Sequence, residues 1–138
     1  MTLPANQEKL FMIATDYKNF QRFFPQQIKY VNIVESNKNE IITEETLFFS
    51  TIIKKDILQR TIHKKLSENT LESKVVTGPF KNSTLVVSFD KIDVGTRISV
   101  NMDLRIDLKY RILSPIIKKR YRTVLTAFFY KINTLALE

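Results

Sequence analysis

The chain has 138 residues, and its 22 Lys and Arg against 14 Asp and Glu give a formal net charge of +8. This length fits a single domain, residues 1–138, with a core that needs no disulfide or metal. The absence of cysteine excludes thiol chemistry and thiolate metal sites, and the single histidine, His63, excludes mechanisms that need two. With no apolar run of ~20 residues and no signal-like N-terminus, we expect a soluble, cytoplasmic protein.

The first predicted elements are two short helices, over residues 5–15 and 16–24. Asn6 is suited to cap the first of them, with Glu8 in the favourable first turn. The second carries three phenylalanines and ends at Pro25. Such a dense aromatic group predicts a contribution to a core or to the rim of a pocket.

Strand patterns take over from residue 28 and continue to residue 108. They cover residues 28–35, 40–53, 57–66, 71–77, 83–91 and 96–108, with turn residues between them. Because the strands follow one another directly, we expect an antiparallel meander of about six strands.

A long helix is predicted over residues 115–137. Its apolar side chains recur at helical spacing and form one broad, partly aromatic stripe. After a strand meander, such a stripe is most readily buried across one face of a curved sheet. The expected fold class is α+β, and this arrangement often encloses a pocket.

The order of motifs resembles a known family. Residues 5–11 (ANQEKLF), 15–20 (TDYKNF) and 23–25 (FFP) resemble the opening helices of the START-like superfamily, also called the helix-grip, SRPBCC or polyketide cyclase/dehydrase-like proteins, and in particular its coenzyme Q-binding branch. Residues 77–83 (TGPFKNS) and 95–100 (GTRISV) resemble two turns of that branch. The resemblance spans nearly the whole chain and implies a helix-grip fold with a ligand cavity between sheet and helix.

One departure concerns the N-terminus. Family members begin with a strand that lies beside the last one, whereas only residues 1–4 precede the first helix here. Either this strand is vestigial or the chain starts later than its relatives. Its loss would leave the edge of residues 96–108 unpaired, and an open edge invites pairing with a second copy, so a homodimer is a hypothesis.

Groups for catalysis are few. The alternation of residues 57–66 places His63 on the face of Gln59 and Thr61, which predicts a solvated strand histidine. Glu44 and Glu45 are adjacent on a strand, so they face opposite ways and cannot act as an acid and base pair. The sequence has no phosphate-binding glycine loop and no metal-ligand spacing, so we expect neither a metal nor a cofactor.

Apolar and aromatic residues from strands, turn and helix are expected to converge beneath the long helix. A cavity lined in this way would bind an apolar ligand, and the alternative is a filled core that uses the same residues. Arg60 shares the parity of Leu58 and Ile62, so it is either a charged anchor inside the cavity or a solvated residue near a strand end. The predicted ligand-binding residues are Phe48, Arg60, Phe80, Phe89, Met102, Leu104, Tyr121, Leu125 and Phe128.

A basic cluster opens the long helix: Lys118, Lys119, Arg120 and Arg122. Cations at a helix N-terminus oppose the helix dipole, which favours a role other than helix stability. An anionic membrane surface and RNA are the two partners considered, and a solvated face is the alternative.

These observations lead to one preferred function and two alternatives. The preferred one is non-catalytic binding or transport of a small hydrophobic ligand, such as a lipid, a quinone or a polyketide-like compound, by a protein that is cytoplasmic or peripheral to a membrane. The first alternative is a binder of ribosomes or RNA, in keeping with the chain's positive charge. The second is a cyclase-like enzyme.

Overall fold

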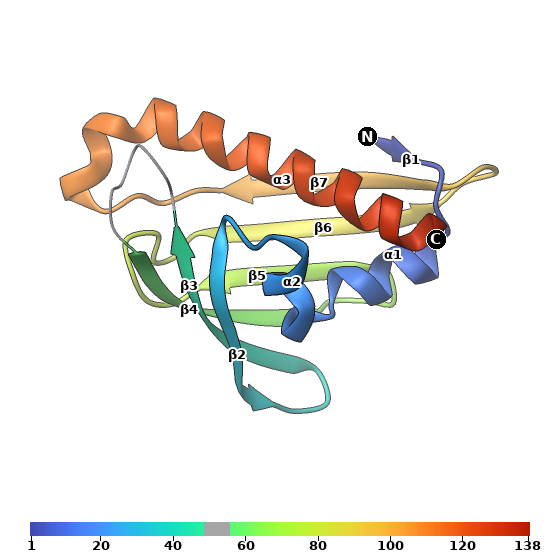
Figure 1. Cartoon of the computed structure of the whole chain (residues 1–138), viewed down its shortest axis with the longest axis horizontal. Coiled ribbons are helices and arrows are strands. Elements are labelled where there is room, and N and C mark those ends of the chain that lie inside the picture. The colour runs from blue at the N-terminus through green and yellow to red at the C-terminus, as the bar shows by residue number, and fades with distance from the viewer. Residues whose placement is uncertain (49–55) are drawn as a thin grey trace.

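The computed structural model describes residues 1–48 and 56–138. One antiparallel sheet, in the order β1-β7-β6-β5-β4-β3-β2, curves beneath a long C-terminal helix (Figure 1). The strands are β1 (Thr2–Leu3), β2 (Ile28–Ser36), β3 (Glu40–Phe48), β4 (Asp56–Lys65), β5 (Thr70–Val75), β6 (Thr84–Lys91) and β7 (Thr96–Asp103). The predicted meander is confirmed, with seven strands rather than about six. Residues 49–53 of the second predicted strand lie outside the described residues.

The helices occupy the two ends of the chain, as predicted. They are α1 (Gln7–Ala14), the 3-10 turn η1 (Tyr17–Asn19), α2 (Phe20–Phe23), the 3-10 turn η2 (Leu108–Leu113) and α3 (Ser114–Leu137). Asn6 caps α1, because its side chain accepts the backbone N–H groups of Glu8 and Lys9. The last predicted strand is shorter than expected, since residue 108 already belongs to η2.

The first strand is short. β1 pairs only Thr2 with Arg97 and Leu3 with Thr96, although the Ile98 N–H also donates to the Met1 carbonyl oxygen (2.8 Å). Within the described residues no strand pairs with β7 beyond Ile98 on this side. Pairing of that edge with a second copy stays a prediction.

The Gly95–Thr96 turn holds the N-terminus against the sheet. Gly95 has φ +100°, and a Cβ at this position would collide with the Leu3 carbonyl oxygen. The Thr96 hydroxyl donates to the Ala5 carbonyl oxygen (2.9 Å) and is fully buried. The glycine therefore permits the close approach of β1, and the threonine fixes the chain between β1 and α1.

The long helix packs tightly at both of its ends. Near its C-terminus, Phe129, Ile132 and Ala136 join a core formed with α1 and strands β5 to β7. Near its N-terminus, Ile117 joins a second core around Phe80. The middle of α3 lies between these two cores, and that is where the sheet and the helix leave space.

Candidate ligand-binding site

A cavity of about 260 Å³ lies between the two cores. Its roof is the middle of α3, where Tyr121, Val124, Leu125 and Phe128 face the sheet. Its floor comes from the inward faces of the central strands, and its walls are predominantly apolar. The volume lies just below the ~300–1,000 Å³ of typical ligand clefts, so it suits a compact molecule.

Aromatic rings form one wall of the cavity. The ring of Phe128 on α3 lies 5.5 Å from that of Phe20 and 5.3 Å from that of Phe24, measured between centroids. Phe20 begins α2 and Phe24 follows its last residue. Two of the three phenylalanines predicted near Pro25, Phe20 and Phe24, therefore join α2 to the long helix and line the cavity, whereas Phe23 does not line it.

Most of the predicted ligand-binding residues line this cavity. They are Phe48, Phe89, Met102, Leu104, Tyr121, Leu125 and Phe128. Phe80 does not line it: it is fully buried in the second core, with its ring edge-on to that of Tyr121 at 6.0 Å. Contact of any of these residues with a ligand remains a prediction.

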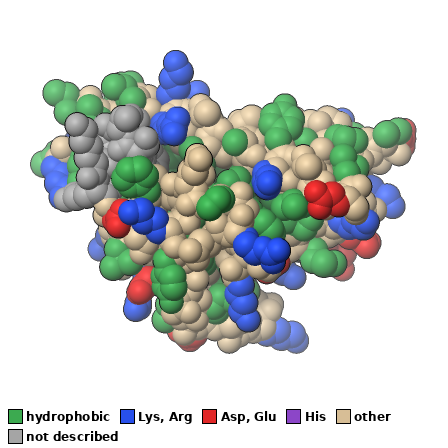
Figure 2. Space-filling view, viewed as in Figure 1, with side chains coloured by type: hydrophobic (Ala, Val, Ile, Leu, Met, Phe, Trp, Pro, Cys, Tyr) green, Lys and Arg blue, Asp and Glu red, His purple; other side chains and the backbone are tan. Residues whose placement is uncertain are grey.

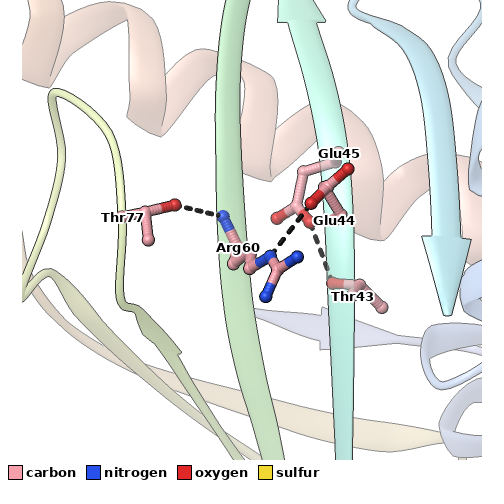
Figure 3. A network of polar contacts seen from close by, with 5 residues as sticks. All are labelled: Thr43, Glu44, Glu45, Arg60 and Thr77. Atoms are coloured by element: carbon pink, nitrogen blue, oxygen red, sulfur yellow. Dashed lines mark hydrogen bonds and ion pairs between the residues drawn. The ribbon is translucent and has the colours of Figure 1, made fainter. Parts of the chain in front are cut away.

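The prediction that Arg60 binds the ligand is wrong, because its side chain points away from the cavity. Its Nε lies 2.9 Å from a Glu44 carboxylate oxygen on the outer face of the sheet, and its backbone N–H donates to the Thr77 hydroxyl (Figure 3). The inner positions of β4 belong to Ile57, Gln59 and Thr61, while Leu58 on Arg60's face is 60% exposed. The guanidinium is thus solvated and paired outside, and it offers no anchor to a ligand in the cavity.

The prediction that His63 is solvated is also wrong. Its ring stacks on that of Tyr17, with centroids 4.1 Å apart, and both ring nitrogens have partners: Thr43 Oγ1 at 3.0 Å and Ser73 Oγ at 2.7 Å. Removal from solvent lowers the pKa of His63 to about 3, because the imidazolium would lose its hydration. The histidine is a neutral part of the cavity wall and not a solvated strand residue.

Glu45 lies on the inner face of β3, opposite in direction to Glu44, as the strand alternation predicts. Three side chains donate to its carboxylate: Thr43 (2.9 Å), Gln59 (3.2 Å) and Thr61. Burial raises the pKa of Glu45 above its ordinary value, and the three hydrogen bonds oppose that effect. The result is an acidic group held inside a mainly apolar chamber.

These side chains form a polar group that the sequence did not predict. We call it the β3–β4 polar cluster, and it consists of Thr43, Glu45, Gln59, Thr61 and His63 with Ser73 from the adjacent strand β5. One signal pointed to it. Polar residues alternate on two neighbouring strands, and the antiparallel register places Thr43 beside Thr61 and Glu45 beside Gln59. The alternation identified the face that these residues share, but the apolar residues Leu58 and Ile62 indicated the wrong side as the interior.

Two tyrosine hydroxyls near the cluster also remain neutral. Burial raises the pKa of Tyr17 well above its ordinary range. Burial, together with the charge of Glu45, raises the pKa of Tyr121 to about 12. Both phenols keep their protons across the physiological range and can act as uncharged polar groups in the cavity wall.

The basic cluster lies on the surface of α3. The side chains of Lys118, Lys119, Arg120 and Arg122 are exposed, and Arg120 also reaches the edge of the cavity. Among the described residues, no three His, Asp or Glu side chains gather in a way that would hold a metal ion. None of the described helices is long and apolar enough to cross a membrane.

No protein-family model matches the sequence, and no curated protein is similar to it. Solved structures are similar in fold. TTHA0849 from Thermus thermophilus superposes with a TM-score of 0.80 at 14% identity, covering 99% of this chain and 93% of the other. The Zhui aromatase/cyclase from Streptomyces sp. R1128 gives 0.77 at 10% identity, covering 99% and 89%. Ara h 8.0201 gives 0.73 at 17% identity, covering 99% and 93%.

These similarities define the architecture. The chain has the helix-grip fold, an antiparallel sheet curved around a long C-terminal helix with short N-terminal helices. At these identities the comparison concerns the fold alone. The resemblance to the coenzyme Q-binding branch stays a prediction.

Proposed function

We propose that this protein binds and carries a small apolar molecule in the cavity beneath α3. One observation carries the proposal: α3 is packed at both ends, yet its middle faces a chamber of about 260 Å³ with mainly apolar walls. Interiors are normally filled to crystal-like density, and an unfilled apolar chamber costs stability. Occupation by a ligand offsets that cost. The fold shared with an aromatase/cyclase is in keeping with this proposal.

The test is native mass spectrometry of freshly purified protein, followed by organic extraction. We expect a retained apolar molecule in stoichiometric amount. The matched variants are Leu125→Trp, which fills the chamber from the roof, and Thr126→Trp, which adds the same side chain at the neighbouring exposed position. Only Leu125→Trp should empty the protein. The proposal is wrong if the wild type is empty and no apolar compound raises its melting temperature.

We also propose that the carrier exchanges its ligand at an anionic membrane surface. Three aliphatic side chains in and beside η2 project into solvent: Leu108 is 71% exposed, Ile112 89% and Ile116 54%. Leu108 and Ile112 belong to η2 and Ile116 to the first turn of α3, so all three are exposed at the η2–α3 junction. We call Leu108, Ile112 and Ile116 the aliphatic ridge.

The charge around this ridge supports an anionic partner. Residues 108–122 contain Lys109, Arg111 and the four residues of the basic cluster, and no Asp or Glu. Figure 2 shows basic side chains spread over one face of the molecule, with fewer acidic ones among them. Exposed aliphatic groups flanked by cations match the interface of an anionic bilayer. RNA contacts rely instead on cations with stacking aromatic rings, so the aliphatic ridge favours lipid.

A further inference from the structure

The β3–β4 polar cluster occupies one wall of an otherwise apolar cavity. Burying polar side chains is costly unless each finds a hydrogen-bond partner. A purely apolar ligand would offer no hydrogen-bond partner to any unpaired group of this cluster. The hydrogen bonds of the cluster therefore show which groups are already satisfied and which one is left for a ligand.

The hydroxyl and imidazole protons of the contacts around Glu45 and His63 are used internally. The Thr43 and Thr61 hydroxyls both donate to the Glu45 carboxylate. Because the Thr43 hydroxyl proton is donated to Glu45, the contact between Thr43 Oγ1 and His63 Nε2 requires Nε2 to be the donor and Oγ1 the acceptor. His63 Nδ1 then accepts from the Ser73 hydroxyl at 2.7 Å. No hydroxyl or imidazole proton of this chain of contacts points to a ligand.

One acceptor is left over. The Gln59 amide directs Nε2 to a Glu45 oxygen at 3.2 Å, because two oxygens would repel each other. This fixes Oε1 on the other side of the amide, and among the described residues it has no hydrogen-bond partner. Gln59 is only 4% exposed and lines the cavity. A buried, unpaired acceptor calls for a donor from a bound molecule.

We propose that the carried ligand is a neutral compound whose ring system packs on the phenylalanine wall of the cavity and whose hydroxyl group donates to Gln59 Oε1. This inference rests on the proposed binding function and names its ligand class. The Glu45 carboxyl beside the amide disfavours a ligand carboxylate at this end of the cavity. Arg120 at the cavity edge and the net charge of +8 disfavour a cationic ligand. A ligand hydroxyl can donate a hydrogen bond to Oε1 while the ligand carries neither a negative nor a positive charge.

The test compares two probes that differ by one methyl group, 2-naphthol and 2-methoxynaphthalene. Both present the same rings and the same oxygen, but only the naphthol can donate a hydrogen bond. In a purely apolar chamber the extra methyl group would make 2-methoxynaphthalene the tighter ligand by roughly fourfold. We expect the reverse by calorimetry, with 2-naphthol bound about tenfold more tightly, because the methyl ether leaves Oε1 unpaired.

Two variants assign the preference to the amide. Gln59→Met keeps the length of the side chain and removes the acceptor, so it should lose the naphthol preference and still bind 2-methoxynaphthalene. Glu44→Gln changes the adjacent outward carboxylate of β3 and should keep the wild-type preference. The wild-type comparison needs neither variant to fold.

The outcomes separate the two proposals. If the wild type binds both probes and prefers 2-methoxynaphthalene, the hydroxyl inference is overturned and the binding function stands. Preferential binding of 2-naphthoate over 2-naphthol would overturn the inference as well. If the wild type carries no extractable molecule and no apolar compound, these probes included, raises its melting temperature, the binding function itself fails.

Discussion

His63 sits between the ring of Tyr17 and the hydroxyls of Thr43 and Ser73, and each contact uses the neutral imidazole. A proton added to this ring would break the acceptor role of Nδ1 toward Ser73 and place a charge in a site removed from water. The histidine is therefore a structural part of the cavity wall at neutral pH. Burial of His63 lowers the free energy of unfolding only at acidic pH, where an exposed imidazole would be protonated.

The pH dependence of stability tests this account. The pKa of His63 is about 3 in the folded protein and about 6.5 in an unfolded chain. Between these values the unfolded state binds one more proton, so the free energy of unfolding falls as pH falls. We expect a contribution approaching 1.4 kcal/mol per pH unit near pH 5, which the His63→Asn variant lacks. Denaturant unfolding of both proteins from pH 7 to pH 4 measures it.

Glu45 contributes to the pH dependence of the free energy of unfolding with the opposite sign. Because its pKa is raised, the folded state stays protonated at a higher pH than the unfolded chain, so this contribution falls as pH rises. Both proteins in the comparison keep Glu45, so the difference between their slopes isolates His63. Parallel slopes would show that the imidazole is accessible to protons in the folded protein.

At this scale the sequence allowed a partial prediction. Strand alternation grouped Gln59, Thr61 and His63 correctly, and separated Glu44 from Glu45. It assigned the wrong side to the interior because Leu58 and Ile62 share the other face. Alternation tells which residues share a face, whereas the direction of that face depends on the partner strands. Here Thr43 and Glu45 across β3 complete an inward polar wall that no single strand reveals.

At the scale of elements, α3 is predictable from the sequence and η2 is not. The stripe of α3 is predictable because its apolar residues repeat over about five turns, and cores at both ends confirm it. The uninterrupted alternation of residues 96–108 predicts a strand to Leu108, whereas β7 ends at Asp103 and Leu108 is the first residue of the 3-10 turn η2. Leu108 therefore lies on the aliphatic ridge and not in the core. Periodicity is informative over long elements and weak where a strand ends.

The aliphatic ridge makes a prediction about membranes. We expect the protein to sediment with vesicles of phosphatidylcholine and phosphatidylserine, and the double variant Ile112→Ser, Ile116→Ser to bind about tenfold more weakly, because it loses aliphatic surface that would enter the bilayer. Binding should fall as salt rises and be weak to phosphatidylcholine alone. Val94→Ser removes an aliphatic side chain that is 79% exposed from the β6–β7 turn and serves as the control.

Two results would contradict this account. Equal binding by the wild type and the double variant would mean that the aliphatic ridge does not insert. Salt-dependent RNA binding that the double variant retains, without any vesicle binding, would assign the basic cluster to nucleic acid.

At the scale of the whole molecule, the two termini meet at one end of the sheet (Figure 1). The Ala5 N–H donates to the Asn133 side chain of α3 (3.1 Å), and Thr96 donates to the Ala5 carbonyl oxygen. These contacts anchor the N-terminus without a full first strand. The overall fold was predictable because element order and the long helix leave few arrangements. The cavity volume was not, since a filled core and a hollow one use the same residue types.

The short first strand leads to a prediction about assembly. Since the backbone groups of Ile98 bond to Met1, alternation along β7 directs those of Val100 and Met102 to the same open edge. A second copy that pairs antiparallel about Asn101 would place Val100 opposite Met102 in both directions, as two-fold symmetry requires. We therefore expect light scattering to show a mass that rises from 16.2 kDa toward twice that value with concentration.

Proline substitutions distinguish this edge from the rest of β7. Val100→Pro removes an N–H that points to the open edge, so it should keep the fold and abolish the dimer. Ser99→Pro removes an N–H directed at β6, where Ser99 pairs with Ser88, and should destabilise the monomer instead. A wild-type mass of 16.2 kDa at every concentration would show that the short edge is too small to pair. A dimer that survives Val100→Pro would place the contact on another surface.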